Sequence, residues 1–150
     1  MRAVVQRVTH ASVTIDGQLH SEIQKGFLVL LGIHKQDTRE QAEALCKKIA
    51  GLRVFEDENG RMNLSLDQVG GEILLVSQFT LYGDCSHGYR PSFMEAARPD
   101  TAVPLYELCG AILRGTLGAD KIKTGVFGAD MAVDLTNDGP VTIIMDTDTL

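Results

Sequence analysis

Ile73-Leu74-Leu75-Val76-Ser77-Gln78-Phe79-Thr80-Leu81-Tyr82 is the stretch around which the rest of the chain is organised. Its apolar first half is typical of a strand that is buried on both faces. Ser77, Gln78 and Thr80 then follow without a turn signal, and a core strand tolerates such groups only if each finds a hydrogen-bond partner. In a regular strand Gln78 and Thr80 lie on one face and Ser77 on the other. Two interpretations follow: a strand leaving the core with its polar groups satisfied by backbone, which composition alone favours, or the floor of a substrate pocket.

The composition is that of an ordinary soluble domain. The chain has 150 residues, of which 44% are apolar and 23% charged, and this length predicts one domain, residues 1–150. Fourteen basic and twenty acidic residues give a formal net charge of −6. This charge argues against broad, sequence-independent binding of nucleic acid, including DNA, but leaves recognition of one RNA end open.

The three cysteines form neither a disulfide framework nor a zinc site. Cys46 and Cys109 fall on apolar helical faces and are expected in the core. Cys85 is close to His87 in sequence, but that spacing is weak support for a catalytic dyad. No signal peptide and no run of transmembrane length is recognisable, so we expect a cytoplasmic protein without a membrane partner.

The flanking sequence predicts a mixed, mainly antiparallel β domain with two helices. Asp16-Gly17 is the strongest hairpin signal, and Asn137-Asp138-Gly139-Pro140 reads as an ordinary turn. The absence of regular βα alternation argues against a doubly wound sheet. The expected strands cover residues 2–9, 12–15, 18–24, 27–33, 52–55, 62–64, 121–127, 131–136 and 141–146, besides the central stretch.

Two segments have the apolar period of a helix. Thr38 and Gln41 fit a capping box and Gly51 fits a C-terminal stop, while a second helix is expected from about Thr101 to Gly118. The expected buried faces are Ala42, Leu45, Cys46 and Ile49 on the first helix, and Leu105, Leu108, Cys109 and Ile112 on the second.

Familiar catalytic and metal-binding patterns are missing. There is no P-loop, no GxGxxG after a strand, no GxSxG and no HExxH, so we expect neither a metal nor a cofactor. Nothing selects a serine–histidine–acid triad, although its members need not be neighbours in sequence. Arg90, which precedes Pro91, is either a solvated loop residue or a clamp for an anion near the pocket.

Two stretches together resemble the paired signature motifs of the D-aminoacyl-tRNA deacylase family. These are Ser77-Gln78-Phe79-Thr80-Leu81 and Asn137-Asp138-Gly139-Pro140-Val141-Thr142. The resemblance extends over nearly the whole chain, and the combination of these motifs in this order is highly specific. Further matching segments are residues 6–13, 62–64, 88–93 and 127–131.

The resemblance implies a homodimeric hydrolase with a barrel- or roll-like core that acts on the aminoacylated 3′ end of tRNA. It would cleave the ester of D-aminoacyl-tRNA, and of glycyl-tRNA such as mischarged tRNA-Ala, as a proofreading step of translation. Gly139 and Pro140, joined by a cis bond, would reach into the partner's pocket and hold the substrate's amino group through backbone carbonyls. The opposite wall would be Ser77, Gln78, Phe79 and Thr80, with Ala97 and Met131 as neighbours.

Two mechanisms remain open for the attack of water. In one, Thr80 is a nucleophile, although no base to activate its hydroxyl is evident. In the other, which we prefer, backbone amides near Gln78 and Phe79 stabilise the oxyanion and the terminal ribose hydroxyl assists water. A rigid wall that fixes the amino group and the carbonyl leaves one direction for a side chain, so that an L side chain collides with protein.

The chain departs from the family pattern at two places, and three alternative functions stay open. His87 stands where many relatives have a basic residue, and the C-terminal end is polar and acidic. The alternatives are a sister editing enzyme for a small mischarged L-amino acid with a trans Gly-Pro bond, a non-catalytic nucleic-acid-binding dimer, and a small-ester hydrolase. The last would use Ser77, Ser92 or Cys85.

Overall fold

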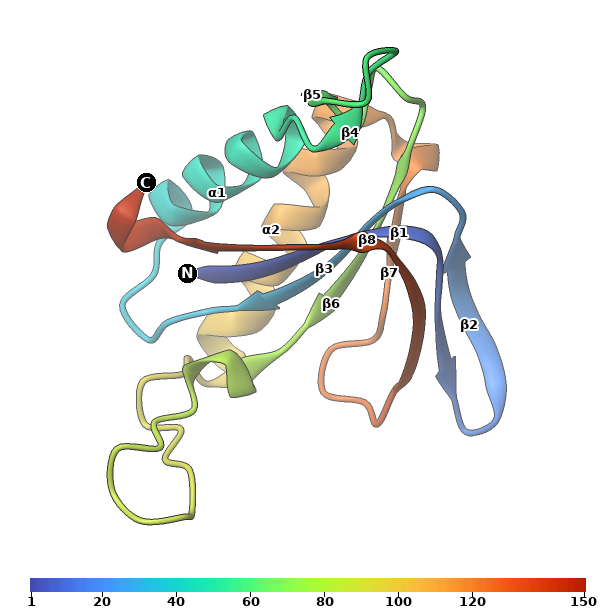
Figure 1. Cartoon of the computed structure of the whole chain (residues 1–150). Helices are drawn as coiled ribbons and strands as arrows, with labels where there is room; N and C mark the ends of the chain where they lie inside the picture. The colour runs from blue at the N-terminus through green and yellow to red at the C-terminus, as the bar shows by residue number, and fades with distance from the viewer.

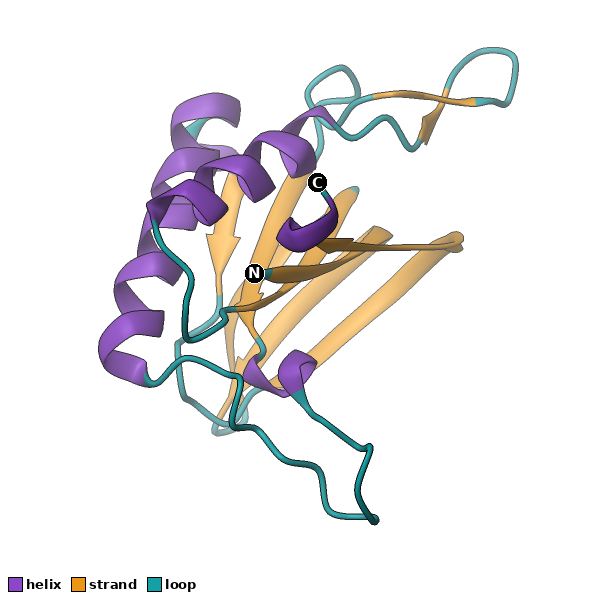
Figure 2. Ribbon diagram, turned by 90° about the vertical axis from the view of Figure 1, so that its left-hand side faces the viewer, coloured by secondary structure: helices purple, strands orange, loops and turns teal.

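A computed structural model describes residues 1–150 and shows two helices packed on one side of a strongly curved sheet (Figures 1 and 2). The sheet contains β1 (Arg2–Ile15), β2 (Gln18–Ile23), β3 (Gly26–Gly32), β6 (Glu72–Ser77), β7 (Ile122–Thr124) and β8 (Ala132–Asp146). A separate hairpin is formed by β4 (Phe55–Glu56) and β5 (Met62–Leu64). The helices are α1 (Arg39–Gly51) and α2 (Pro99–Leu117), and the short 3₁₀ helices are η1 (Phe79–Tyr82), η2 (Ala119–Lys121) and η3 (Thr147–Thr149).

The long first strand organises the sheet. β1 pairs along one edge with β8, and along the other edge with β3 in its first half and β2 in its second half, always antiparallel. The pairs β3–β6 and β6–β7 are parallel, so the sheet is mixed. The Ser21 hydroxyl on β2 donates to the Thr124 carbonyl on β7 at 2.8 Å. The two ends of the sheet therefore approach one another, and the sheet is nearly closed into a barrel.

Strands β3 and β6 each contain a continuous apolar run, residues 27–31 and 73–76. Phe27, Val29 and Leu31 point into the core beneath the helices, whereas Leu28 points into a second core inside the curved sheet. On β6 the same alternation separates Ile73 and Leu75 from Leu74 and Val76. Both faces are covered, which is why neither strand shows a polar face in the sequence.

The local signals were mostly confirmed. Asp16 and Gly17 have φ of 51° and 76°, as a type I′ hairpin requires. Gln41 Oε1 accepts hydrogen bonds from the Thr38 backbone N–H at 2.7 Å and hydroxyl at 2.9 Å. The predicted buried face of α1 is confirmed, and Cys46 and Cys109 are both in the core.

Several expectations were wrong in detail, among them the strand expected over residues 52–55, of which only Phe55 lies in β4. The central strand ends at Ser77 and becomes η1, so Gln78 and Thr80 do not share a strand face. Residues 137–140 are not a hairpin turn, because β8 runs through them, with register shifts against β1. The strand expected over 121–127 is limited to Ile122–Thr124. The buried face of α2 is rotated to Ala102, Tyr106, Cys109, Gly110 and Leu113, and Leu105, Leu108 and Ile112 are only partly buried at its margin.

Candidate functional site

One cavity of about 370 Å³ opens where the carboxyl ends of β3 and β6 meet. These strands are parallel, so their carboxyl ends fall at the same edge of the sheet. Ten of the fourteen lining residues are hydrophobic, and the only ionisable one is Asp130. The lining residues are Leu31, Ile33, Val76, Ser77, Gln78, Phe79, Ala97, Ala102, Phe127, Gly128, Ala129, Asp130, Met131 and Val133.

The polar end of the cavity is made by the transition from β6 to η1. The Gln78 N–H donates to the Leu31 carbonyl at 2.8 Å and ends the ladder of β6. The 3₁₀ turn begins at once, with the Leu81 N–H bonded to the Gln78 carbonyl at 3.3 Å. The N–H groups of Phe79 and Thr80 form no hydrogen bond within the chain, as expected at a helix start. Two adjacent backbone donors are therefore available beside the cavity.

The Thr80 side chain is outside the cavity lining. Thr80 is exposed, and its hydroxyl accepts a short hydrogen bond from Gln78 Nε2. No histidine or carboxylate contacts this hydroxyl. The pair Gln78–Thr80 thus stabilises the turn that presents the free amides.

The far wall is a loop that close packing holds against β6. The Gly125 N–H donates to the Leu75 carbonyl at 3.1 Å, and a Cβ at Gly125 would lie 2.6 Å from Met131 Sδ. The Tyr106 hydroxyl donates to the same Leu75 carbonyl at 2.8 Å and its ring meets Phe127 edge-on. Burial raises the pKa of Tyr106 to about 12, so the phenol stays protonated and keeps this hydrogen bond. The wall is therefore anchored to the strand that ends at Ser77.

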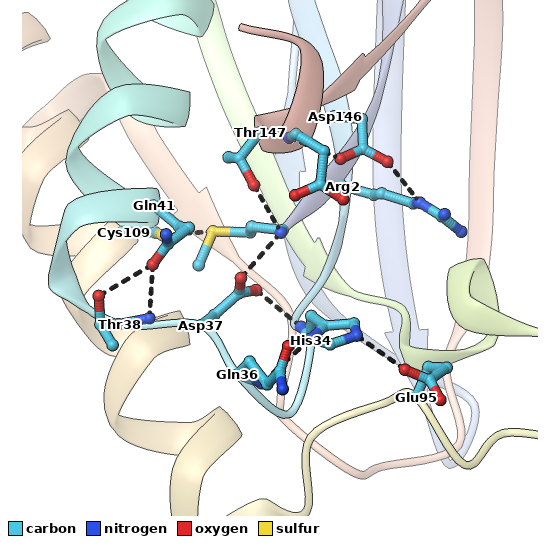
Figure 3. A network of polar contacts seen from close by, with 12 residues as sticks. Arg2, His34, Gln36, Asp37, Thr38, Gln41, Glu95, Cys109, Asp146 and Thr147 are labelled. Atoms are coloured by element: carbon cyan, nitrogen blue, oxygen red, sulfur yellow. Dashed lines mark hydrogen bonds and ion pairs between the residues drawn. The ribbon is translucent and has the colours of Figure 1, made fainter.

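Ala97 reaches the cavity because residues 33–35 hold residues 95–97. The Ala97 N–H donates to the Ile33 carbonyl at 2.8 Å, and the Lys35 N–H donates to the Glu95 carbonyl at 3.0 Å. The His34 ring is 2.9 Å from the Glu95 carboxylate (Figure 3). Hydrogen bonds from His34 and Lys35 hold the pKa of Glu95 below its usual value.

A second network connects the N-terminus to the η1 turn. Arg2 donates to the Leu81 carbonyl at 3.1 Å and to the Asp146 carboxylate at 2.8 Å, and its guanidinium lies 4.5 Å from the centre of the Tyr82 ring. Figure 3 shows the Arg2–Asp146 pair. The Met1 ammonium donates to Asp37 at 3.0 Å and to Thr147 at 2.8 Å. Burial raises the pKa of Tyr82, so this ring also remains neutral. The network ties the pocket turn to the end of β8.

Gly139 and Pro140 lie on an exposed part of β8 and do not line the cavity of their own chain. Their peptide bond is cis, and the φ of Gly139 is 139°. The buried Arg7 donates to the Asp138 carbonyl at 2.9 Å and to the Val54 carbonyl at 2.6 Å. The Val141 N–H donates to Asn137 Oδ1 at 2.6 Å. The segment is thus firmly held although it is presented to the outside.

The structure separates the predicted site residues into two groups. Ser77, Gln78, Phe79, Ala97 and Met131 line one cavity. Thr80 lies beside that cavity, while Gly139 and Pro140 lie outside it. The roles assigned to these residues remain predictions.

Sequence reasoning missed several residues that shape the site. Leu31, Ile33 and Ala102 were interpreted as core or not singled out, because an apolar residue at a strand or helix end carries no signal of its own. Arg7 was not singled out either, since one arginine in a strand is usually solvated, whereas here only 5% of the residue is exposed.

The chain contains no group of three or more His, Cys, Asp or Glu side chains placed to hold a metal ion. Neither of the two helices combines the length and the hydrophobicity needed to span a bilayer.

Comparison with known proteins gives consistent results. Residues 4–146 match the family described as D-Tyr-tRNA(Tyr) deacylase. D-aminoacyl-tRNA deacylase of Thermus aquaticus is 58% identical over 147 residues, covering 98% of this chain and 95% of the relative. That of Parabacteroides distasonis is 55% identical over 148 residues, covering 98% and 97%.

Two solved structures share the fold. One, titled c-Myc DNA Unwinding Element Binding Protein, superimposes with a TM-score of 0.93 at 46% identity, covering 97% of this chain and 98% of the other. The second, titled as a probable eukaryotic D-amino acid tRNA deacylase, has a TM-score of 0.83 at 16% identity, covering 96% and 97%. At that identity the second likeness concerns the fold alone.

Proposed function

The chain belongs to the D-Tyr-tRNA(Tyr) deacylase family and is a D-aminoacyl-tRNA deacylase; from this premise we propose how its site selects and cleaves the ester. The substrate is the 3′ end of a tRNA carrying a D-amino acid, and the products are free tRNA and the D-amino acid. The reaction serves proofreading in the cytoplasm, where tRNA is charged.

The observation that carries the proposal is that the predicted site residues fall on two separate parts of the chain, the cavity and the Gly139–Pro140 segment. The cavity has two free backbone donors at its rim, whereas the rigidly held Gly139–Pro140 segment is exposed and lies outside it. We infer that the active form is a homodimer in which each chain inserts this segment into the other's cavity. In a twofold dimer one such contact implies its equivalent, so two complete sites form together.

Selection between enantiomers follows from rigid geometry. In the proposed dimer the carbonyls of Gly139 and Pro140 accept hydrogen bonds from the substrate's ammonium, while the η1 amides bind the ester carbonyl. With these two groups fixed, the side chain of a D residue points toward solvent and that of an L residue collides with backbone. Glycine has no side chain to reject, so glycyl-tRNA, including glycine mischarged on tRNA-Ala, is also a substrate.

The free amides of Phe79 and Thr80 are the proposed oxyanion donors. This refines the expectation for residues 78–79, because the Gln78 amide is already bonded to Leu31. Preorganised backbone donors lower the barrier without any ionisable side chain. The terminal ribose hydroxyl of the tRNA then assists the attacking water.

Thr80→Ala tests the role of the hydroxyl. The variant should keep turnover within about tenfold of wild type, because only the hydrogen bond with Gln78 is lost. Single-turnover kinetics on D-tyrosyl-tRNA measures this. Abolished turnover with substrate binding intact would instead make Thr80 the nucleophile.

The function itself is tested with matched D-tyrosyl-tRNA and L-tyrosyl-tRNA in the presence of a chelator. Rapid loss of the D ester with the L ester spared is expected. Cleavage of neither ester by the folded dimer would contradict the assignment, and cleavage of a small L-aminoacyl-tRNA alone would indicate the sister editing activity.

A second candidate function is favoured by the relative titled as a DNA unwinding element binding protein, which is 46% identical. The net charge of −6 argues against general binding of DNA, because such binding depends on basic side chains that neutralise the phosphates. Steeply salt-dependent binding of duplex DNA without deacylation would support it.

A further inference from the structure

A loop between η1 and α2 projects from the body of the protein (Figures 1 and 2), and Phe79 and Ala97, which lie near its two ends, line the cavity. Together with Phe79 at the start of η1, this loop exposes four large apolar side chains to an extent that is unusual for a soluble domain. The exposed fraction is 106% for Tyr89, 79% for Met94, 54% for Phe79 at the start of η1, and 38% for Phe93. No other segment of the chain exposes more than one aromatic ring to this extent.

The base of this loop has a defined structure. Asp84 and Ser92 exchange two backbone hydrogen bonds of 2.8 and 2.9 Å. Asp84 Oδ1 also accepts a hydrogen bond from the Ser86 N–H at 2.9 Å. Residues 85–91 are therefore the tip of a hairpin-like arm whose base is fixed, and Tyr89 and Arg90 belong to that tip.

The arm is continuous with the cavity. Phe79 lines the cavity, and its ring meets Phe93 edge-on with centroids 5.1 Å apart. Aromatic surface thus continues from the mouth of the cavity onto the base of the arm. A chain whose last unit occupies the cavity leaves it next to these rings.

The arginines of this region are uncompensated, in contrast to the chain as a whole. Arg90 in the arm and Arg98 just before α2 form no ion pair, whereas the charge of Glu95 is balanced by Lys35 at 3.2 Å. The chain carries −6 overall. The arm and the start of α2 therefore carry guanidinium groups that form no ion pair with a carboxylate of the chain.

Exposed aromatic rings interleaved with free arginines are the features that bind single-stranded nucleic acid. Bases stack on the rings regardless of sequence, and the guanidinium groups bind the phosphates. We propose that the arm, residues 83–94, binds the unpaired nucleotides of the tRNA that precede the aminoacylated one. Bases stack on Phe93 and Tyr89, and Arg90 binds a phosphate between them. This inference rests on the proposed function.

Kinetics on two substrates isolate the arm from the chemistry. One substrate is D-tyrosyl-tRNA, and the other is adenosine esterified with D-tyrosine at its 3′ position, which ends before the arm. Tyr89→Ala and Arg90→Ala should each raise KM for the tRNA about tenfold, the loss expected for one stacked base or one phosphate contact. Both variants should keep the wild-type kcat on the tRNA and the wild-type rate on the adenosine ester.

Controls within the chain separate specific contacts from general effects. Tyr89→Phe retains a stacking surface and should therefore keep the wild-type KM for the tRNA. Arg61→Ala removes an equally exposed arginine from the remote β4–β5 hairpin and should change nothing. Arg90→Ala should also reduce the slope of log(kcat/KM) against log[salt] by about 0.7, the value for one phosphate on a single strand.

Cys85 provides a measurement that does not depend on catalysis. It is the exposed cysteine, whereas Cys46 and Cys109 are buried, so alkylation by iodoacetamide reports on the arm alone. Uncharged tRNA with an intact 3′ end should slow this alkylation several-fold, and tRNA lacking its last three nucleotides should not.

The outcomes are distinguishable. An unchanged KM for tRNA in both variants, or an equal loss on the adenosine ester, overturns the inference while leaving the deacylase intact. Dissociation of the dimer in the variants would show that a second copy of the chain covers this surface, and this also overturns it. A wild-type protein that cleaves neither substrate refutes the proposed function, while protection of Cys85 by tRNA would still support RNA binding.

Discussion

The segment at the end of β6 and the segment in the middle of β8 share one property and differ in another. Both hold their backbone with dedicated hydrogen bonds, from Gln78 to Leu31 in one case and from Arg7 to Asp138 in the other. The first faces a cavity built by its own chain, and the second faces solvent. In the proposed dimer, a rigidly held segment that is exposed and lies outside the cavity of its own chain supplies half of the partner's site.

The largest effect is expected from Gly139→Ala. The φ of 139° disfavours any Cβ, and the added atom would lie 2.8 Å from Val141 Cγ2 and 2.9 Å from the Val141 nitrogen. Displacement of this segment should lower kcat/KM for D-tyrosyl-tRNA by about a hundredfold or more. Unchanged circular dichroism would show that the fold survives, and near-wild-type kinetics would contradict the role of the segment.

Mixing two inactive variants tests the division directly. Ala97→Phe fills the cavity but leaves β8 intact. Gly139→Ala alters β8 but leaves the cavity open. Random exchange of subunits makes half of the dimers mixed, each with one complete site, so roughly a quarter of the wild-type activity should return. No recovery after verified exchange would place both segments in the same subunit's site.

Arg7→Met should have the next largest effect, since it removes the support of the exposed segment. The guanidinium is buried, and its loss leaves the carbonyl of Val54 without its 2.6 Å partner. We expect about 3 kcal/mol less unfolding free energy, as for other buried charge-assisted hydrogen bonds. Urea denaturation measures this, and kcat/KM should fall more than tenfold.

Arg53→Met is the matched control for that substitution. Arg53 donates to the Asn63 carbonyl at 2.7 Å, but it is exposed. Its replacement should change stability by less than about 1 kcal/mol and leave the kinetics unchanged. If both variants lost activity equally, the effect would not be specific to the β8 segment.

Arg2→Met should produce a smaller effect at the other segment. It removes the hydrogen bond to the Leu81 carbonyl and the contact with the Tyr82 ring, which steady the η1 turn. Because Arg2 is partly exposed, kcat should fall about fivefold with KM little changed. Arg2→Lys should recover part of this loss, and Arg39→Met, which removes an exposed ion pair on α1, should have no effect.

The smallest expected effect is a pH dependence carried by Asp146. Burial acts against its ionisation, but hydrogen bonds from Arg2 and the Asp148 N–H outweigh it and lower the pKa of Asp146 from its usual value. A lowered folded-state pKa adds stability above the unfolded-state value, and this stability is lost as the pH falls through the folded-state value. Asp146→Asn should therefore cost less than about 1 kcal/mol near pH 6 and nothing at the acidic end. A constant difference at every pH would contradict the ion pair's contribution.

Elements set by short-range contacts were predictable. The type I′ turn at Asp16-Gly17 and the hydrogen bonds of Thr38 with Gln41 depend on neighbours within three residues. The apolar runs of β3 and β6 were interpreted correctly because both faces are covered. The end of β6 was missed, since Phe79 and Leu81 continue the alternation of a strand although the chain turns.

The candidate site was predictable where the sequence contains a motif that resembles those of a known family. Ser77, Gln78 and Phe79 form such a motif, and the structure places all three on the cavity. The turn signals of residues 137–140 were misleading, because pairing with β1 carries β8 through them. Arg7 could not be anticipated, since its burial depends on strands and loops distant in sequence.

The sequence by itself determined the two helices, most of the strands and, through two motifs, the family. Those features rest on composition, periodicity and local hydrogen bonds, which neighbouring residues settle. Only the tertiary structure decided that Leu31, Ile33 and Ala102 complete the cavity around residues 77, 97 and 131, and that β8 runs through residues 137–140 instead of turning there. The reason is that a cavity wall depends on parallel pairing and packing between distant segments, for which no local pattern of side chains is required.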